Sequence, residues 1–110
     1  MNRLAPTKNL CQDDPVSAQP PFAVVIVTRD HAETLGACLE AVEGLVRTPT
    51  RVVVVDNDST DRSPEIAEKR AGNPTVTVLR EKRNTGFAAA TNRGISVTSE
   101  PWILLLNPDC

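Results

Sequence analysis

Four segments of the chain are short runs rich in branched apolar residues. Residues 22–28 (FAVVIVT) and 51–56 (RVVVVD) are almost uninterrupted, which is typical of strands that are covered on both faces. Residues 75–79 (TVTVL) alternate between polar and apolar positions, as a shorter and partly exposed strand does. Residues 102–106 (WILLL) form the last run. The pattern therefore predicts four strands.

Between the first two runs, apolar residues recur at helical spacing and predict a helix over residues 32–46. Asp30 and Glu33 resemble a capping box with an aspartate in place of Ser or Thr, so we expect Asp30 to cap this helix. The apolar face of the helix consists of Leu35, Cys38, Leu39, Val42, Leu45 and Val46.

Two shorter helices are expected further along the chain. Ser63 as the cap and Pro64 at the first helical position predict a helix that runs to about Ala71 and stops at the following Gly-Asn-Pro. Residues 87–97 predict a third helix, which Gly94 and several threonines weaken. Strands and helices thus alternate, which predicts an α/β fold: a parallel sheet with right-handed crossovers and helices on both faces.

Length and charge narrow the class of protein. A chain of 110 residues accommodates one small domain or part of a larger one. The formal net charge is −2 without a run of like charges, so the chain offers no broad basic surface for nucleic acid. The longest apolar runs are about five residues, against roughly 20 in a membrane-spanning helix, so no transmembrane segment is expected.

Residues 1–21 contain four of the nine prolines and show neither strand nor helix periodicity, so we interpret them as a flexible leader. They lack the apolar stretch of a secretory signal, which favours a cytoplasmic protein. The three cysteines, at positions 11, 38 and 110, have no C-x-x-C spacing, which argues against a disulfide framework and against a zinc site. We expect Cys38 to act as a small apolar side chain.

Polar residues collect where the predicted strands end. Ligands of open parallel sheets bind beyond the carboxyl ends of the strands, so this rule alone selects candidate residues. Carboxylates that gather at one edge repel one another unless a cation or hydrogen-bond donors are present, which favours a divalent metal or ribose hydroxyls there. The selected residues are Thr28, Arg29 and Asp30 after the first strand, Asp56, Asn57, Asp58, Ser59 and Asp61 after the second, Asn84, Thr85 and Gly86 before the third helix, and Asn107 and Asp109 after the fourth strand.

Several of these residues have a purely structural alternative. An Asp at the end of a strand is about as often only a turn former or a helix cap, and we expect Asp30 and Ser63 to act chiefly as caps. Asp58 is equally consistent with a solvated side chain. His31 has no second His or Cys nearby, so a metal-ligand or catalytic role is not expected for it. The basic residues Arg80, Lys82 and Arg83 are interpreted as a solvated loop.

Two nucleotide-binding motifs are absent from the sequence. No G-x-G-x-x-G follows the first strand, and no G-x-x-x-x-G-K-[ST] occurs anywhere. A phosphate bound by this chain would therefore need a metal ion and arginines to neutralise its charge.

With these candidates in place, residues 22–110 resemble the start of a family 2 glycosyltransferase with the GT-A fold, and most closely its rhamnosyltransferase-type bacterial members. Four motifs carry the resemblance, in order and in register. They are VVIVT at 24–28 with ETL at 33–35 and CL at 38–39, VVVDNDSTD at 53–61, NTGFAAATNRG at 84–94, and LLLNPD at 104–109.

The resemblance implies roles for individual residues. Thr28 and Asp56 match positions that hold the uridine or thymidine part of a UDP- or dTDP-sugar, and Asp58 and Asp61 match the polar loop nearby, where Asp61 is mainly structural. The segment that passes under the donor contributes Asn84, Gly86 and Arg93, of which Arg93 is a pyrophosphate contact.

Residues 107–109 (NPD) occupy the place of the family's D-x-D triplet. The resemblance implies that Asn107 contacts the donor and that Asp109 is the ligand of a divalent metal, Mg²⁺ or Mn²⁺. It further implies transfer of the sugar, with inversion, to the hydroxyl of a glycan or lipid-linked acceptor at the inner face of the cell membrane.

The chain also departs from the family pattern. Arg29 and Asp30 stand where many relatives have Tyr-Asn, so donor preference is expected to differ. The general base and the acceptor site are expected beyond Cys110, and no catalytic residue is assigned within the chain. The alternatives are a receiver-type phosphoacceptor domain, which lacks a suitably placed Lys here, and a non-catalytic remnant.

Overall fold

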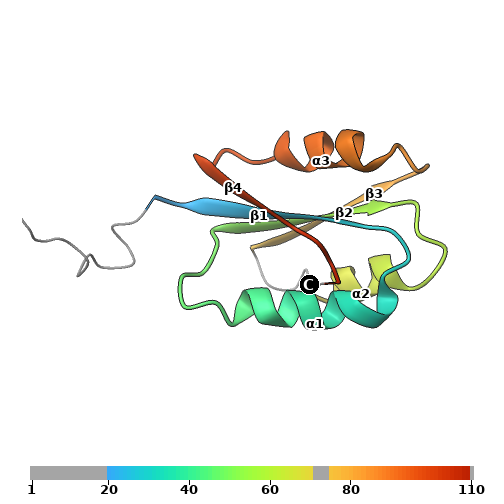
Figure 1. Ribbon diagram of the computed structural model, residues 1–110, viewed down its shortest axis with the longest axis horizontal. Coiled ribbons are helices and arrows are strands. Elements are labelled where there is room, and N and C mark those ends of the chain that lie inside the picture. Colours follow the sequence, from blue (N-terminus) through green and yellow to red (C-terminus); the bar gives the residue numbers. More distant parts are fainter. Residues whose placement is uncertain (1–19, 71–74, 110) are drawn as a thin grey trace, which may run out of the picture.

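The protein is a single parallel sheet between two layers of helices. The computed structural model describes residues 20–70 and 75–109. The four strands of the sheet lie in the order β3-β2-β1-β4. Helices α1 and α2 cover one face of the sheet and α3 covers the other (Figure 1). Along the chain the elements are β1 (Phe22–Thr28), α1 (Ala32–Glu43), β2 (Arg51–Asn57), α2 (Ser63–Arg70), β3 (Val76–Glu81), α3 (Phe87–Ile95) and β4 (Trp102–Leu106).

The α/β class and all seven expected elements are confirmed, with shifts at their ends. Helix α1 ends three residues early because Gly44 closes it, donating to the carbonyls of Glu40 and Ala41. Leu45 and Val46 therefore leave the apolar face, and Val46 is 94% exposed. Strand β3 extends to Glu81, two residues beyond the expected end. Helix α3 ends at Ile95 rather than at residue 97.

Each face of the sheet packs its own core. Val24, Ile26 and Val54 point toward α1 and α2, whereas Val25 and Val55 point toward α3. Because successive side chains of a strand point to opposite faces, the near-continuous valine runs supply both cores. Leu35, Cys38, Leu39 and Val42 are buried on α1, which confirms the apolar role expected of Cys38.

Gly94 lets α3 approach the sheet closely. A Cβ atom at this position would lie 2.7 Å from Val25 Cγ1 and 3.0 Å from Val55 Cγ2. The glycine that weakens the helical pattern in the sequence is thus the residue that allows the helix to pack.

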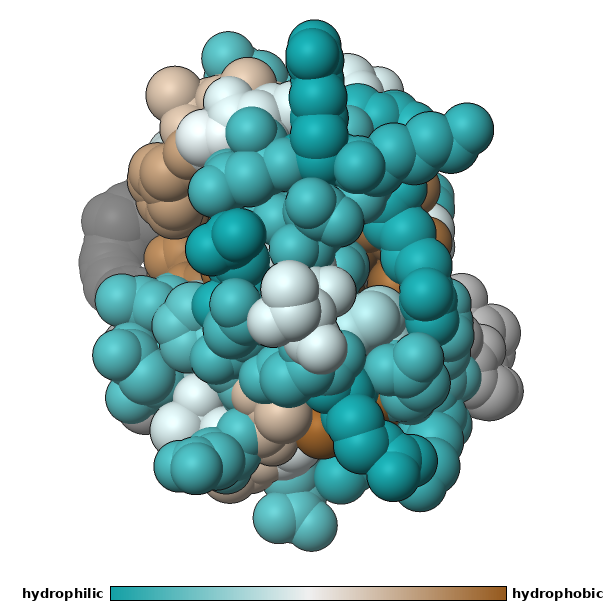
Figure 2. Space-filling model, turned by 90° about the vertical axis from the view of Figure 1, so that its right-hand side faces the viewer, coloured by the Kyte–Doolittle hydropathy of each residue, from teal (hydrophilic) through white to brown (hydrophobic). Residues whose placement is uncertain are grey.

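Register aligns the ends of the strands. Thr28 pairs with Asp56 across β1 and β2, and Ile26 pairs with Leu106 across β1 and β4. The loops after β1, β2 and β4 consequently meet at one edge of the sheet, which we call the carboxyl edge. Hydrophilic residues cover most of this edge (Figure 2).

Some expectations lie outside the described residues. These are residues 1–19 of the leader expected over residues 1–21, the stop of α2 at Gly72-Asn73-Pro74, and the cysteines at 11 and 110. In the part of the chain that is described, no helix has the length and apolar character of a membrane span.

Candidate functional site

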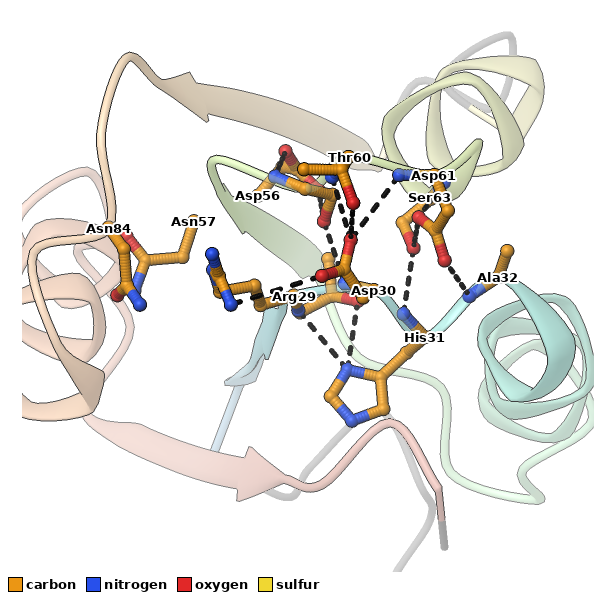
Figure 3. Close-up of polar contacts among 12 residues, drawn as sticks. Arg29, Asp30, His31, Ala32, Asp56, Asn57, Thr60, Asp61, Ser63 and Asn84 are labelled. Atoms are coloured by element: carbon orange, nitrogen blue, oxygen red, sulfur yellow. Dashed lines mark hydrogen bonds and ion pairs between the residues drawn. The ribbon is translucent and has the colours of Figure 1, made fainter.

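The carboxyl edge joins two buried polar residues to a network of loop hydrogen bonds (Figure 3). Thr28 and Asp56 end neighbouring strands and are both buried. The Asp56 carboxylate accepts a hydrogen bond from the backbone of Ser59 at 3.1 Å and another from its hydroxyl at 2.7 Å. Ser59 Oγ in turn accepts from the backbone N–H of Asp30 at 2.9 Å. The loops after β1 and β2 are therefore tied together through Asp56.

Asp30 does not cap α1, contrary to expectation. His31 precedes the first helical residue, without a side-chain cap, and its carbonyl accepts from Leu35 N–H. Asp30 has a φ of 59°, in the left-handed region that Asp tolerates better than most residues. This conformation directs its carboxylate to the other loop, where Oδ1 accepts from Thr60 N at 2.7 Å, Thr60 Oγ1 at 3.1 Å and Asp61 N at 3.3 Å. These bonds, first among them the one from the Thr60 backbone, lower the pKa of Asp30.

Asp61 serves the start of two helices at once. Its Oδ2 accepts from Ala32 N at 3.0 Å, and its Oδ1 accepts from Ser63 N at 2.8 Å and from Ser63 Oγ at 2.6 Å. The hydrogen bond from the Ser63 hydroxyl is the main cause of a lowered pKa at Asp61. Ser63 is itself the first residue of α2 rather than its cap, so that expectation is wrong. Its hydroxyl accepts instead from His31 N at 2.9 Å.

Asn57 connects the end of β2 to the start of α3. Its Oδ1 accepts from Thr85 N at 3.0 Å and from Thr85 Oγ1 at 3.2 Å. Its Nδ2 donates to Asn84 Oδ1 at 2.8 Å and to Gly86 O at 3.4 Å. Gly86, with a φ of 89°, is the N-cap residue of α3 and supplies no side-chain cap. The sequence placed Asn57 at this edge but indicated no role for it.

A cavity of about 440 Å³ opens at the carboxyl edge between β1, β4 and α3. Two of the residues for which the resemblance implies a donor contact, Asn84 and Asn107, line it. Arg29 and His31 line it as well, although the sequence pattern indicated no ligand role for His31. The other lining residues are Val25, Val27, Asn57, Phe87, Thr91, Leu105 and Leu106. Its wall therefore combines five apolar side chains from β1, β4 and α3 with six polar ones, most of which come from the loops at the carboxyl edge.

Other predicted residues lie around this cavity rather than in its lining. Thr28 and Asp56 are buried at the ends of their strands, and Asp58 is exposed with a φ of 66°. Arg93 lies in the last turn of α3, where its Nε is 3.5 Å from a Glu81 carboxylate oxygen. Gly86 precedes the first turn of the same helix.

Asp109 lines a second hollow of about 330 Å³ at the start of α1. Asp30, His31, Glu33 and Asp61 also line it. The oxygens of Asp30 and Asp61 already accept backbone hydrogen bonds, whereas Asp109 is exposed. Within residues 20–70 and 75–109, no three His, Cys, Asp or Glu side chains converge as a preformed metal site.

Arg80 is not part of a solvated loop, contrary to expectation. It lies in β3 and donates from Nε and Nη2 to the two carboxylate oxygens of Glu68, at 2.7 and 2.8 Å. The bidentate pair lowers the pKa of Glu68. Both side chains are roughly half exposed, so the pair contributes little to stability.

Solved structures of the same architecture confirm the GT-A fold. The mannosyltransferase PcManGT from Pyrobaculum calidifontis, solved with GDP-Man and Mn²⁺, superposes with a TM-score of 0.77 at 23% identity over 93% of this chain and 31% of that chain. Glucosyl-3-phosphoglycerate synthase from Mycobacterium tuberculosis, solved with Mn²⁺, UDP and glucosyl-3-phosphoglycerate, gives 0.70 at 18% identity over 84% of this chain and 35% of that one.

Sequence similarity narrows the relationship to a family. The PGL/p-HBAD biosynthesis glycosyltransferase of Mycobacterium bovis (strain BCG / Pasteur 1173P2) is 31% identical over 93 residues, which cover 84% of this chain and 36% of the relative. The chain thus spans about a third of the length of this relative. Residues 23–110 match the family described as glycosyl transferase family 2. The protein therefore belongs to glycosyl transferase family 2.

Proposed function

We propose that this chain carries the donor-binding part of a glycosyltransferase that uses a nucleoside-diphosphate sugar. The observation that carries the proposal is the cavity of about 440 Å³ at the carboxyl edge. Ligands of open α/β sheets bind at this edge. The two solved structures of the same fold, which hold GDP-Man and UDP, support the choice of ligand class.

The polar residues divide between the two ends of such a donor. Thr28 and Asp56 lie at the ends of β1 and β2 and Asp58 follows β2 directly, and we assign their hydroxyl and carboxylate oxygens as acceptors of hydrogen bonds from a uridine or thymidine. Asn84, Gly86, Arg93 and Asn107 are assigned to the diphosphate and the sugar. Arg29 adds a cation at the cavity wall, where its Nη1 lies 3.9 Å from Asp30 Oδ2. Its charge offsets the charge of a diphosphate and replaces an aromatic ring that would stack on the base.

The exposed carboxylate of Asp109 is suited to binding a divalent metal. Mg²⁺ and Mn²⁺ commonly take one or two protein carboxylates and complete their coordination with phosphate oxygens and water. Asp109 is an exposed carboxylate and supplies one such ligand. When bound, the metal would neutralise charge on the leaving diphosphate.

Transfer itself requires more than the residues described above. In the proposed reaction, an acceptor hydroxyl attacks the anomeric carbon, the bond to the diphosphate breaks, and the configuration inverts. A base must take the hydroxyl proton. We assign no residue of this chain to that role, and we expect no transfer of a hexosyl or deoxyhexosyl group by the 110-residue chain alone. The proposed acceptor is a glycan or lipid-linked hydroxyl at the inner face of the membrane.

Calorimetric titration tests the proposal directly. Uridine, thymidine and guanosine diphosphates are titrated into the 110-residue chain with Mn²⁺, with Mg²⁺ and with neither metal. We expect at least one diphosphate to bind, and to bind more tightly with the metal. Orthophosphate with the same metals is the control for non-specific anion binding. No binding of any diphosphate, or binding no tighter than that of orthophosphate, would contradict the proposal.

A further inference from the structure

We propose that Asn57 is the positioning residue of the cavity. It holds the loop of residues 84–86 and orients the Asn84 amide so that its NH₂ group is left for a ligand. The proposal rests on the proposed function for the identity of that ligand. Its geometry rests on hydrogen bonds within the described part of the chain, residues 20–70 and 75–109.

Asn57 is buried and uses both ends of its amide. It is the last residue of β2 and is only 3% exposed. Its oxygen accepts from the backbone and hydroxyl of Thr85, and its nitrogen donates to Asn84 Oδ1 and Gly86 O. One side chain on a strand end therefore contacts all three residues of the loop that precedes α3. Figure 3 shows the amides of Asn57 and Asn84 side by side.

The direction of the Asn57 amide follows from its neighbours. The Thr85 backbone N–H can only donate, so the amide atom 3.0 Å away must be the acceptor oxygen. If the oxygen and nitrogen of the Asn57 amide were exchanged, its NH₂ group would face the Thr85 N–H, and both groups are donors. The exchange would also set the Asn57 oxygen against the acceptor oxygen of Gly86. The hydrogen-bond network thus allows one orientation.

This orientation determines what Asn84 can offer. Asn84 Oδ1 accepts from Asn57 Nδ2 at 2.8 Å and from Gly86 N at 3.0 Å, which occupies both of its lone pairs. Asn84 Nδ2 has no protein partner in the described part of the chain, and Asn84 lines the cavity. Asn84 is therefore assigned as a donor to an acceptor oxygen of the ligand, such as a phosphate, hydroxyl or carbonyl oxygen.

The loop needs such an anchor because it has little other support. Residues 84–86 are exposed, Gly86 has a φ of 89°, and α3 begins without a side-chain cap. Glycine is the most flexible residue in an unanchored chain. Removing the Asn57 amide would leave Thr85 N–H without its partner and Asn84 Oδ1 with only the bond from Gly86 N–H, so the loop would lose its link to β2.

The experiment compares Asn57→Ala, Asn84→Ala and the double variant with the wild-type chain. The exposed Asn92 of α3, which lies outside the cavity lining, provides Asn92→Ala as the matched control. Titration with nucleoside diphosphate and Mn²⁺ gives the affinities, and amide hydrogen exchange reports on Thr85 and Gly86. Thermal unfolding of each variant sets a temperature at which all are folded. Should Asn57→Ala fail to fold, Asn57→Asp keeps the bonds to Thr85 and removes the donor, with Asn92→Asp as its control.

We expect Asn57→Ala to weaken diphosphate binding about tenfold or more, because a buried hydrogen-bond partner is lost. Exchange at Thr85 and Gly86 should rise by a similar factor. Because Asn57 acts through Asn84, the double variant should lose little more affinity than either single variant. A purely structural role would not produce this coupling in affinity.

Three outcomes would overturn the proposal: unchanged affinity in Asn57→Ala, unchanged exchange at Thr85 and Gly86, or additive losses in the double variant. Failure of the proposed function has a different signature. In that case the wild-type chain binds no diphosphate, which also removes the ligand assigned to Asn84. The exchange measurement still decides whether Asn57 holds the loop.

Discussion

The carboxylate of Asp61, in the loop after β2, accepts a hydrogen bond from the backbone N–H of Ala32, the first residue of α1, at 3.0 Å. Its other oxygen accepts from Ser63 at the start of α2. One side chain thus satisfies backbone donors at two helix starts, which have no partners within their own helices. Asp61 is a structural link between the two loops that frame the carboxyl edge.

Asp61→Ala should lower the free energy of unfolding by about 1–3 kcal/mol, because a helix cap and further hydrogen bonds are lost together. Urea denaturation followed by circular dichroism measures the change. Glu40→Ala, at an exposed position of α1, is the control and should change stability by less than about 0.5 kcal/mol. Equal stability of the two variants would show that the Asp61 bonds contribute nothing measurable.

Acid should lower the stability that the hydrogen bonds to Asp30 and Asp61 provide. The pKa values of Asp30 and Asp61 are lowered from an ordinary value of 3.8 by hydrogen bonds that the folded chain donates to them. A carboxyl with a depressed pKa contributes stability that is present above its unfolded pKa and is lost as pH falls through the folded pKa. Stability measured by urea denaturation should therefore decrease as pH falls from about 5 toward 2. The variant Asp30→Asn/Asp61→Asn should show a flatter dependence, and an unchanged slope would contradict the assignment.

Gly94→Ala should destabilise the protein, although alanine favours helices by about 1 kcal/mol over glycine. The added methyl would lie 2.7 Å from Val25 Cγ1, so α3 must shift or the core must distort, at a cost of about 1–3 kcal/mol. Gly36→Ala in α1 is the matched control, because its nearest contact is Ile66 Cγ2 at 3.8 Å. Thermal melts should move in opposite directions for the two variants, and a rise in both would show that α3 does not pack closely at Gly94.

Asp56 and Asp109 should affect ligand binding in different ways. Asp109→Asn should remove most of the dependence of diphosphate binding on Mn²⁺ or Mg²⁺, because it removes the proposed metal ligand. Asp56→Ala should weaken binding with or without metal, by about 1–3 kcal/mol for a hydrogen bond to a buried partner. Calorimetric titration of each variant with and without metal separates the two effects. If neither substitution alters affinity or metal dependence, both residues are structural.

The 110-residue chain should self-associate through β4. This strand forms one edge of the sheet, and its side chains Trp102, Leu104 and Leu105 are 63%, 44% and 49% exposed. Exposed apolar edge strands pair with other chains. Leu104→Lys should therefore shift the chain toward monomer in size-exclusion chromatography with light scattering.

Val46→Lys is the control for this prediction, since Val46 is an exposed apolar residue that lies outside the sheet. It should leave the association unchanged. A wild-type chain that is monomeric and melts cooperatively at every concentration would contradict the prediction.

The order and type of the elements can be predicted from the sequence alone. Runs such as VVVV at 52–55 bury both faces of a strand, and the spacing from Leu35 to Val42 buries one face of a helix; both patterns are local and need no partner to be recognised. The sequence also placed the polar residues at the strand ends, because parallel strands bring their carboxyl ends to one edge. The relationship to family 2 could be inferred from the sequence for the same reason, because the family's motifs lie at these strand ends.

Which group each polar side chain contacts depends on how the chain folds in three dimensions. Asp30 has the sequence signature of a cap for α1, yet it is Asp61 that accepts the hydrogen bond from the backbone N–H of Ala32 at that helix start, and Asp30 accepts from Thr60 instead. The choice depends on the pairing of Thr28 with Asp56, which brings the loop after β2 against the loop after β1. Asn57 and Asn84 are likewise 27 residues apart and meet only because β2 and α3 are packed together. Local pattern identifies residues that can cap, turn or bind, whereas a hydrogen bond requires two groups within about 3 Å, which only the folded chain brings together.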